Sequence, residues 1–355
     1  MFSKSASRPV VSYQRFRGKD MSERWVWRLQ ERPEGMDFEP AFEFKSELIP
    51  ELAPGEILIK NIYIGMDAGT RNWLHPREDG FDVPLPLGSA MIGILVGTIE
   101  ESNHPAYTKG MLVRAYGQWA DYSIVNPAEA GVFVVDPDID DIRQYIGLIG
   151  PSGWTSYFGV LDVGKPKPGE TFLVSAAAGS TGSIAGQVAR IAGCRTIGIA
   201  GSDEKIDWIK SDLGFDEGIN YKKDNVEEKI REYAPNGIDI YFDNVAGPIL
   251  DAVLPNMAIH GRIALSGLMD SYNAEGPVPG PYKFEYLLHK RVSITGFFSP
   301  DYFHLGHESD ARMRQWLDEG LITFRFDETN GVENTLTAYK KMFTGGNIGK
   351  SIVKV

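Results

Sequence analysis

The 355-residue sequence contains a single cysteine, Cys194. One thiol permits no disulfide within the chain and no cysteine-rich zinc site, so this usage is typical of a cytoplasmic protein and excludes a disulfide-stapled secreted domain. The longest almost uncharged apolar run, residues 90–99, is half as long as the ~20-residue segment that a membrane-spanning helix needs. We therefore expect no membrane span and a cytoplasmic location.

Positive charge is also scarce. Lysine and arginine total 36 against 48 acidic residues, which gives a net charge of −12. An acidic surface repels a phosphodiester backbone, so we expect no nucleic-acid partner. Charged residues make up 24% and hydrophobic residues 43%, an ordinary globular composition, and the length suffices for two domains.

The start of the chain is rich in basic residues: the first 20 residues hold five basic side chains and one acidic side chain. This bias is shared with transit peptides, but the segment lacks the apolar core of a secretory signal. We expect a frayed N-terminal end.

The chain changes character near Thr171. Before residue 140, short β-rich runs such as 55–64 and 90–100 are broken by proline and glycine, which predicts a compact β-rich domain. From Thr171 onward, apolar strand-like runs alternate with helix-length segments. The predicted strands are 171–177, 195–201, 217–221, 237–245 and 261–267.

This alternation is what right-handed crossovers fold into a parallel sheet, so we expect a doubly wound Rossmann domain. A further strand is predicted over 292–298, an amphipathic helix near 311–320, and a last strand over 351–355. We expect this tail to leave the Rossmann sheet.

The strongest local motif follows the first of these strands, where Ala177-Ala178-Gly179-Ser180-Thr181-Gly182 leads into a helix. It is the dinucleotide-binding fingerprint with alanine in place of the first glycine. Glycine at 179 lets a pyrophosphate approach the backbone, and Gly182 lets the helix lie close to the sheet. Because strand, turn, helix and second strand follow in order, we favour cofactor binding over a merely tight turn.

The end of the second strand bears on which cofactor binds. An NAD enzyme usually has an acidic residue there, whereas this sequence has Ala200 and Gly201. Asp203 fits a first-turn helix position, and Lys205 can reach towards a 2′-phosphate, so NADP is favoured over NAD. On spacing alone, Lys205 is equally well explained as a solvated helix lysine.

Metal-binding residues are too few for zinc in its usual protein sites, which take three or four ligands, mostly cysteine and histidine. Cys194 fits a small buried hydrophobe between helix and strand. His304 and His307 lie in a loop-like segment with no third ligand nearby. We expect no metal.

Several motifs carry a family resemblance: 175–194 (SAAAGSTGSIAGQVARIAGC), 213–222 (LGFDEGINYK), 237–247 (GIDIYFDNVAG) and 345–355 (GGNIGKSIVKV). In this order they resemble the zinc-independent medium-chain dehydrogenase/reductases of the prostaglandin reductase and alkenal double-bond reductase group, also called leukotriene 12-hydroxydehydrogenase-like. The resemblance covers residues 147–355. It is looser at the turn that contains Asp67 and Arg71, where Ala68 and Gly69 replace the usual Pro-Tyr.

The resemblance implies a Rossmann domain over 143–305, a β-rich GroES-like substrate domain over 1–142, and a return segment, 306–355, that completes the GroES-like domain. It also implies a set of cofactor contacts. Gly179, Ser180, Thr181 and Gly182 would hold the pyrophosphate, Lys205 and Tyr221 the 2′-phosphate, Asn244 the ribose, and Ser266, Gly267, Tyr272, Phe297, Phe298, Ser299 and Asn347 the nicotinamide end.

The proton donor is less defined. Relatives place a tyrosine eight residues before the first Phe of the strand matched to 292–298, a position occupied here by His289, and the nearest tyrosine is Tyr286. Either side chain could donate a hydrogen bond to a developing enolate. The alternative is that both belong to an amphipathic helix and only pack on the Rossmann domain.

The implied function is NADPH-dependent hydride transfer to the β-carbon of a small hydrophobic α,β-unsaturated ketone or aldehyde. The resemblance also implies a homodimer through the edge of the Rossmann sheet. The alternatives are an NADPH quinone oxidoreductase on the same scaffold and a non-catalytic NADPH-binding protein.

Overall fold

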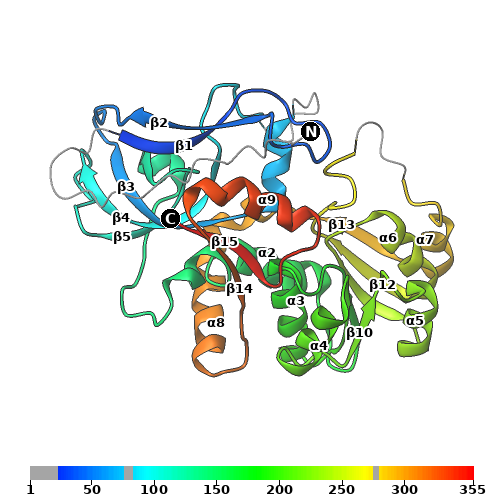
Figure 1. Ribbon diagram of the computed structural model, residues 1–355. Helices are drawn as coiled ribbons and strands as arrows, with labels where there is room; N and C mark the ends of the chain where they lie inside the picture. The colour runs from blue at the N-terminus through cyan, green and yellow to red at the C-terminus, as the bar shows by residue number, and fades with distance from the viewer. Residues whose placement is uncertain (1–22, 76–82, 275–279) are drawn as a thin grey trace, which may run out of the picture.

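The computed structural model describes residues 23–75, 83–274 and 280–355. The basic segment 1–20, for which a frayed end is expected, lies outside these residues. The described chain forms two β-sheet domains that lie side by side (Figure 1).

The Rossmann domain is built on a parallel sheet with the strand order β10-β9-β8-β11-β12-β13. In chain order this is 3-2-1-4-5-6, the doubly wound arrangement whose switch point lies between β8 and β11. The strands are β8 (Thr171–Val174), β9 (Arg195–Ala200), β10 (Glu217–Asn220), β11 (Ile238–Asp243), β12 (Met257–Leu265) and β13 (Ser293–Gly296).

Helices cover both faces of this sheet, so its central strands are apolar throughout. Phe172 and Phe242 face a core shared with the first group of helices, whereas Leu173 and Tyr241 face a core shared with the second. The first group is α2 (Pro151–Phe158), α3 (Ser180–Ile191), α4 (Asp203–Ser211) and α8 (Gly306–Asp318). The second group is α5 (Val226–Tyr233), α6 (Gly247–Val253) and α7 (Glu285–Lys290).

The β-rich domain is a mixed sheet with the order β14-β15-β3-β4-β5-β7, to which β6 adds by pairing with β3. A separate antiparallel pair, β1 and β2, packs beside it. The strands are β1 (Glu23–Leu29), β2 (Phe42–Leu48), β3 (Ile57–Gly65), β4 (Ile92–Ser102), β5 (Leu112–Gln118), β6 (Tyr122–Val125), β7 (Phe133–Val134), β14 (Phe326–Asn330) and β15 (Lys350–Lys354). Its helices are α1 (Pro127–Ala130) and α9 (Thr335–Phe343), with the 3₁₀ helices η1 (Ala68–Leu74), η2 (Ile142–Ile146) and η6 (Val332–Asn334).

The tail returns to the first domain, as expected: β15 pairs antiparallel with β3 and parallel with β14. Helix α8, at the start of the predicted return segment, instead packs on the Rossmann core through Met313 and accepts a 2.6 Å hydrogen bond from Trp154 of α2 at Asp310. The domain limits 1–142, 143–305 and 306–355 stay predictions. The predicted fold class, a Rossmann sheet with a β-rich GroES-like domain, is confirmed.

Candidate functional site

The fingerprint turn joins β8 to α3 in a very small space. A Cβ atom on Gly182 would lie 2.3 Å from the carbonyl oxygen of Ala176, and one on Gly179 would lie 3.2 Å from the same oxygen. A side chain at 182 is therefore excluded. In the described part of the chain no side chain caps α3, so its first-turn N–H groups remain available to an anion. This cradle fits the pyrophosphate of a dinucleotide.

Two serines of α2 hold the start of α3 in place. Ser180 donates a 2.8 Å hydrogen bond to the hydroxyl of Ser152, and the hydroxyl of Ser156 donates to the carbonyl oxygen of Thr181 at 2.9 Å. Both α2 serines are buried. The sequence analysis missed them, although their spacing of four residues places them on one helix face.

The two residues predicted to bind the 2′-phosphate both lie next to the segment that follows β9: Lys205 lies in α4, and Tyr221 packs against Gly201. The ring of Tyr221 covers Gly201, where an added Cβ would lie 2.9 Å from the ring. The Lys205 ammonium donates to the carbonyl oxygen of Gly345 at 3.0 Å. Burial, followed by the charge of Lys222, lowers the pKa of Lys205. A partly desolvated ammonium beside a second lysine is a site that an anionic group would stabilise.

Asp203 lies in the first turn of α4, as expected, and is engaged elsewhere. Its carboxylate accepts a hydrogen bond from Asn220 at 2.6 Å and forms a short ion pair with Lys223. It is exposed and does not take the place of the acidic residue that binds the ribose of NAD.

Asn244 follows β11 at the switch point and is 9% exposed. Its backbone N–H donates to the hydroxyl of Ser175 at 2.9 Å, and its side-chain amide donates to the Ser175 carbonyl at 2.8 Å. The neighbouring Asp243 is fully buried, and its Oδ1 accepts from Ser175, Tyr241 and the N–H of Ala246. Burial raises the pKa of Asp243 despite these bonds. Asp243 therefore fixes the turn that carries Asn244.

The segment after β12 is attached to the same turn. The N–H groups of Ser266 and Gly267 both donate to the carbonyl oxygen of Asp243, at 2.8 and 3.1 Å. Tyr272 is half-buried, and a Cβ on Gly267 would lie 3.5 Å from its hydroxyl. Burial raises the pKa of Tyr272, so its phenol stays a hydrogen-bond donor at neutral pH.

Two further predicted contacts reach the switch point from the C-terminal half. Asn347 is buried and donates to the carbonyl oxygen of Gly349 at 2.8 Å, while the N–H of Gly349 donates to Ala178 of the fingerprint turn at 2.8 Å. The Phe297 ring packs on Phe242 with centroids 6.0 Å apart. Phe298 is 38% exposed, and Ser299 begins the 3₁₀ helix η5 (Ser299–Leu305).

The candidate proton donors lie elsewhere. Tyr286 and His289 sit on the six-residue helix α7 with ring centroids 5.9 Å apart. Tyr286 packs on the core of the sheet face covered by α5 and α6, and His289 is exposed. Figure 1 shows α7 at the outer end of the Rossmann domain, beyond α6. The structure does not bring these side chains together with the cofactor set, and their catalytic role stays a prediction.

The 3₁₀ helix η1 contributes residues whose partners the sequence analysis missed. Asp67, just before η1, forms a short ion pair with the ammonium of Lys350, which is 1% exposed. Arg71, also 1% exposed, donates to the side chain of Asn273 at 3.0 Å. Both contacts join η1 to segments more than 200 positions away in the sequence.

Comparisons with known proteins bear on this arrangement. Residues 25–134 match the N-terminal domain of oxidoreductase, and residues 180–318 match zinc-binding dehydrogenase. The chain is 38% identical over 308 residues to the NADP-dependent 2-alkenal reductase of Nicotiana tabacum, with 86% of this chain and 89% of the relative covered. It is 36% identical over 334 residues to prostaglandin reductase 1 of Bos taurus, with 92% and 98% covered. The structure of CurA in complex with NADPH from Vibrio vulnificus matches with a TM-score of 0.87 at 36% identity, over 94% of this chain and 99% of that chain.

The chain belongs to the prostaglandin reductase and alkenal double-bond reductase family of medium-chain dehydrogenase/reductases. The predicted family is confirmed, and the resemblance extends well before residue 147, into the β-rich domain.

One matched domain carries the description zinc-binding dehydrogenase. Within the described residues, no three His, Cys, Asp or Glu side chains cluster as metal ligands. Burial raises the pKa of Cys194 to about 11, which disfavours the thiolate that zinc needs. His304 lies in η5 and His307 in α8. In the same residues, no helix is both long and apolar enough to span a bilayer.

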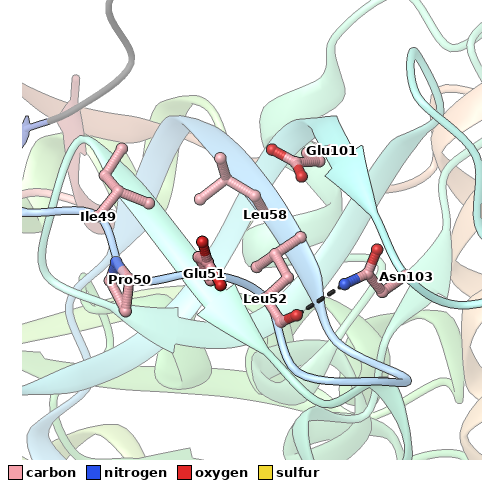
Figure 2. Close-up of a pocket in the computed structure, with 7 residues that line it drawn as sticks. All are labelled: Ile49, Pro50, Glu51, Leu52, Leu58, Glu101 and Asn103. Atoms are coloured by element: carbon pink, nitrogen blue, oxygen red, sulfur yellow. Dashed lines mark hydrogen bonds between the residues drawn. The ribbon is translucent and has the colours of Figure 1, made fainter.

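Figure 2 shows a hollow on the β-rich domain, and none of the predicted cofactor residues lines it. It encloses about 380 Å³, and the side-chain amide of Asn103 donates across it to the carbonyl oxygen of Leu52 at 2.7 Å. It is lined by Ile49, Pro50, Glu51, Leu52, Leu58, Glu101 and Asn103. Its polar side chains are the carboxylates of Glu51 and Glu101, which accept hydrogen bonds, and the amide of Asn103, which already donates to Leu52. This lining does not suit a substrate carbonyl, which needs a hydrogen-bond donor.

Proposed function

We propose that this chain is an NADPH-dependent reductase that transfers hydride to the β-carbon of small hydrophobic α,β-unsaturated ketones or aldehydes. The observation that carries the proposal is the fingerprint turn together with the Lys205 and Tyr221 corner at the end of β9. Relatives at 35–38% identity are named 2-alkenal reductase and (+)-pulegone reductase, which supports the same substrate class.

The cofactor is NADP, and this chain's residues suit its parts. The first turn of α3 would hold the pyrophosphate, and Lys205 with Tyr221 would hold the 2′-phosphate. Asn244 and Asn347 would lie at the ribose and nicotinamide end. Bound NADPH supplies the hydride for the β-carbon of the substrate.

Hydride addition to the β-carbon places negative charge on the carbonyl oxygen of the substrate, which needs a hydrogen-bond donor. Burial raises the pKa of Tyr272, so this side chain keeps its phenolic proton at neutral pH, and it lies in the segment 266–273 that would line the nicotinamide end. Tyr286 and His289 remain the alternative donors. The three variants Tyr272→Phe, Tyr286→Phe and His289→Ala test which side chain is the donor. We expect the variant that lacks the donor to lower kcat and kcat/KM together, by about a hundredfold, while NADPH affinity is kept.

The proposed function is tested by NADPH oxidation with a panel of an enal, a cyclic enone, the matching saturated ketone and a simple quinone. Reduction of the enal and enone at the C=C bond, with no turnover of the saturated ketone, is the expected outcome, and product analysis identifies the reduced bond. Faster turnover of the quinone would favour the quinone reductase alternative. NADPH binding without any turnover would favour a non-catalytic protein.

We also propose that catalysis needs no metal, because conjugation already makes the β-carbon electrophilic. Dialysis against a strong chelator should leave enone reduction unchanged. Activity lost on dialysis and restored by zinc would contradict this.

A homodimer through β13 and a cytoplasmic location complete the proposal. β13 is the edge strand of the parallel sheet, and all four of its residues are exposed, with Ile294 at 37%. The neighbouring Phe284 and Leu288 are 61% and 78% exposed. An uncovered edge beside apolar side chains is a surface that a second copy can cover. Ile294→Lys should shift the mass measured by light scattering from dimer to monomer.

A further inference from the structure

Arg71 is a buried cation whose printed contacts reach both domains. Its side chain lies beneath η1 and is 1% exposed, and among the described residues no carboxylate lies within ion-pair distance. The guanidinium carbon lies 5.4 Å from the ring centre of Phe38. Buried charges are ordinarily paired because desolvation penalises them strongly. The described residues hold the guanidinium through carbonyl and amide oxygens, and one of these contacts crosses between the two domains.

The polar contacts of Arg71 point in two directions. Within its own domain, Nη2 donates to the carbonyl oxygens of Pro33 and Gly35 at 3.4 and 3.0 Å. Across the domain boundary, Nε donates to Oδ1 of Asn273 at 3.0 Å. Nη1 has no partner in the described structure. The guanidinium thus donates to two main-chain oxygens of its own domain through Nη2 and to a side chain of the other domain through Nε. A lysine ammonium cannot reproduce this planar set of donors.

Asn273 lies in the segment 266–273 that follows β12, which would line the nicotinamide end of the cofactor. The other end of this segment is fixed at the switch point, where Ser266 and Gly267 donate to Asp243 and Met269 donates to the carbonyl oxygen of Asn244. Between these two attachments lies Tyr272. The hydrogen bond to Arg71 is thus the attachment that ties the far end of the segment to η1 of the β-rich domain.

We infer that Arg71 is a positioning residue: by holding Asn273, it sets the segment 266–273 against η1 of the β-rich domain, the implied substrate domain, and so fixes the proposed nicotinamide site relative to the enone. This inference rests on the proposed function. Hydride transfer depends steeply on donor–acceptor placement, and a small displacement can slow it by orders of magnitude. The contact therefore acts on the chemical step rather than on cofactor affinity.

The kinetic test uses Asn273→Ala, Asn273→Asp and Arg71→Lys in the full-length chain. Asn273→Ala should lower kcat for an enone about tenfold or more, with NADPH dissociation constant and melting temperature near wild type, and Arg71→Lys should lower kcat of the folded protein by a similar factor. The isotope effect with 4-deuterated NADPH should rise, because the hydride step becomes rate-limiting. Asn273→Asp keeps the acceptor oxygen and should retain wild-type kcat.

Arg32→Met is the matched control. Arg32 also lies beside η1 and donates to the carbonyl oxygens of Trp73 and Leu74, but both bonds stay within its own domain. It should leave kcat and the isotope effect unchanged. Wild-type kcat in Asn273→Ala, or an equal loss in Arg32→Met, would overturn the inference.

Amide hydrogen exchange provides a measurement that does not depend on turnover. Peptides covering 266–273 should exchange faster in Arg71→Lys and Asn273→Ala than in the wild type, with α3 unchanged. Unaltered exchange in that segment would overturn the inference even if the chain reduced no enone. Wild-type enone reduction measured in parallel separates this result from a failure of the proposed function.

Discussion

At the scale of single residues, Lys205 and Tyr221 should decide between the two dinucleotides. The double variant Lys205→Ala/Tyr221→Phe removes a charge-assisted contact to a group that only NADPH carries, worth about 1.5 to 3 kcal/mol. NADPH affinity should therefore fall by about ten- to a hundredfold while NADH affinity barely changes. Titration of cofactor fluorescence measures both. Equal losses of affinity for NADPH and NADH would contradict the assignment of Lys205 and Tyr221 to the 2′-phosphate.

Gly182 gives a steric prediction at the same scale. Gly182→Ala places a methyl group 2.3 Å from the Ala176 carbonyl oxygen, so α3 must shift away from the turn. We expect a large loss of NADPH affinity together with a lower melting temperature. Gly280→Ala is the control, because a Cβ there meets nothing within 4 Å. A fully active Gly182→Ala enzyme would show that the close approach of helix and turn is not needed.

At the scale of elements, the ion pair between Glu170 and Arg262 ties the start of β8 to β12. Arg262 donates to both carboxylate oxygens, at 2.8 and 2.7 Å, and the pair is largely buried. This hydrogen bonding lowers the pKa of Glu170. The pair therefore contributes its full stability above about pH 4.3, the ordinary glutamate pKa, and loses it as the pH falls through the lower folded-state value.

Glu170→Gln should accordingly lower the melting temperature at neutral pH, because the free energy of unfolding falls by about 1.5 to 3 kcal/mol. The difference from wild type should shrink as the pH falls below about 4. Thermal unfolding followed across that pH range checks both statements. A pH-independent difference would mean that packing, and not the charge of Glu170, sets the effect.

The secondary-structure elements show which parts of the fold could be predicted from the sequence. The strands and helices between 171 and 267 follow from local alternation, because each apolar run is bounded by its own turn residues. The fingerprint turn, Lys205 and Tyr221 each follow a strand of the parallel sheet, whose carboxyl ends lie at one edge, so local pattern sufficed to place them. Arg71 with Asn273, and Asp67 with Lys350, depend on how two domains meet, which no local pattern encodes. Counting back from Phe297 located His289 in the chain but did not indicate that α7 covers a different part of the domain.

At the scale of the whole molecule, a charged cluster joins the two domains. Arg114 of β5 lies 3.6 Å from Asp310 of α8, which also accepts from Trp154 of α2. Burial lowers the pKa of Arg114 and raises that of Asp310. Each single variant, Arg114→Met or Asp310→Leu, leaves one buried charge alone and should destabilise by about 3 to 5 kcal/mol.

The double variant Arg114→Met/Asp310→Leu should lose less than the sum of the two single losses, because neither charge is left unpaired. Melting temperatures of the four proteins complete the cycle. Additive losses would show that the two side chains contribute independently to the domain contact.

The pairing of β15 with β3 has a consequence for how the protein is made. Asp67 follows β3, and its partner Lys350 begins β15, 283 positions later. At ribosomal rates of about 5 to 20 residues per second, the Tyr63–Gly65 end of β3 waits roughly 15 to 60 seconds for its partner strand. Throughout that time an apolar strand edge is exposed to other nascent chains. Because Gly349 also contacts the fingerprint turn, one short segment, synthesised late, completes the substrate sheet and the cofactor turn together.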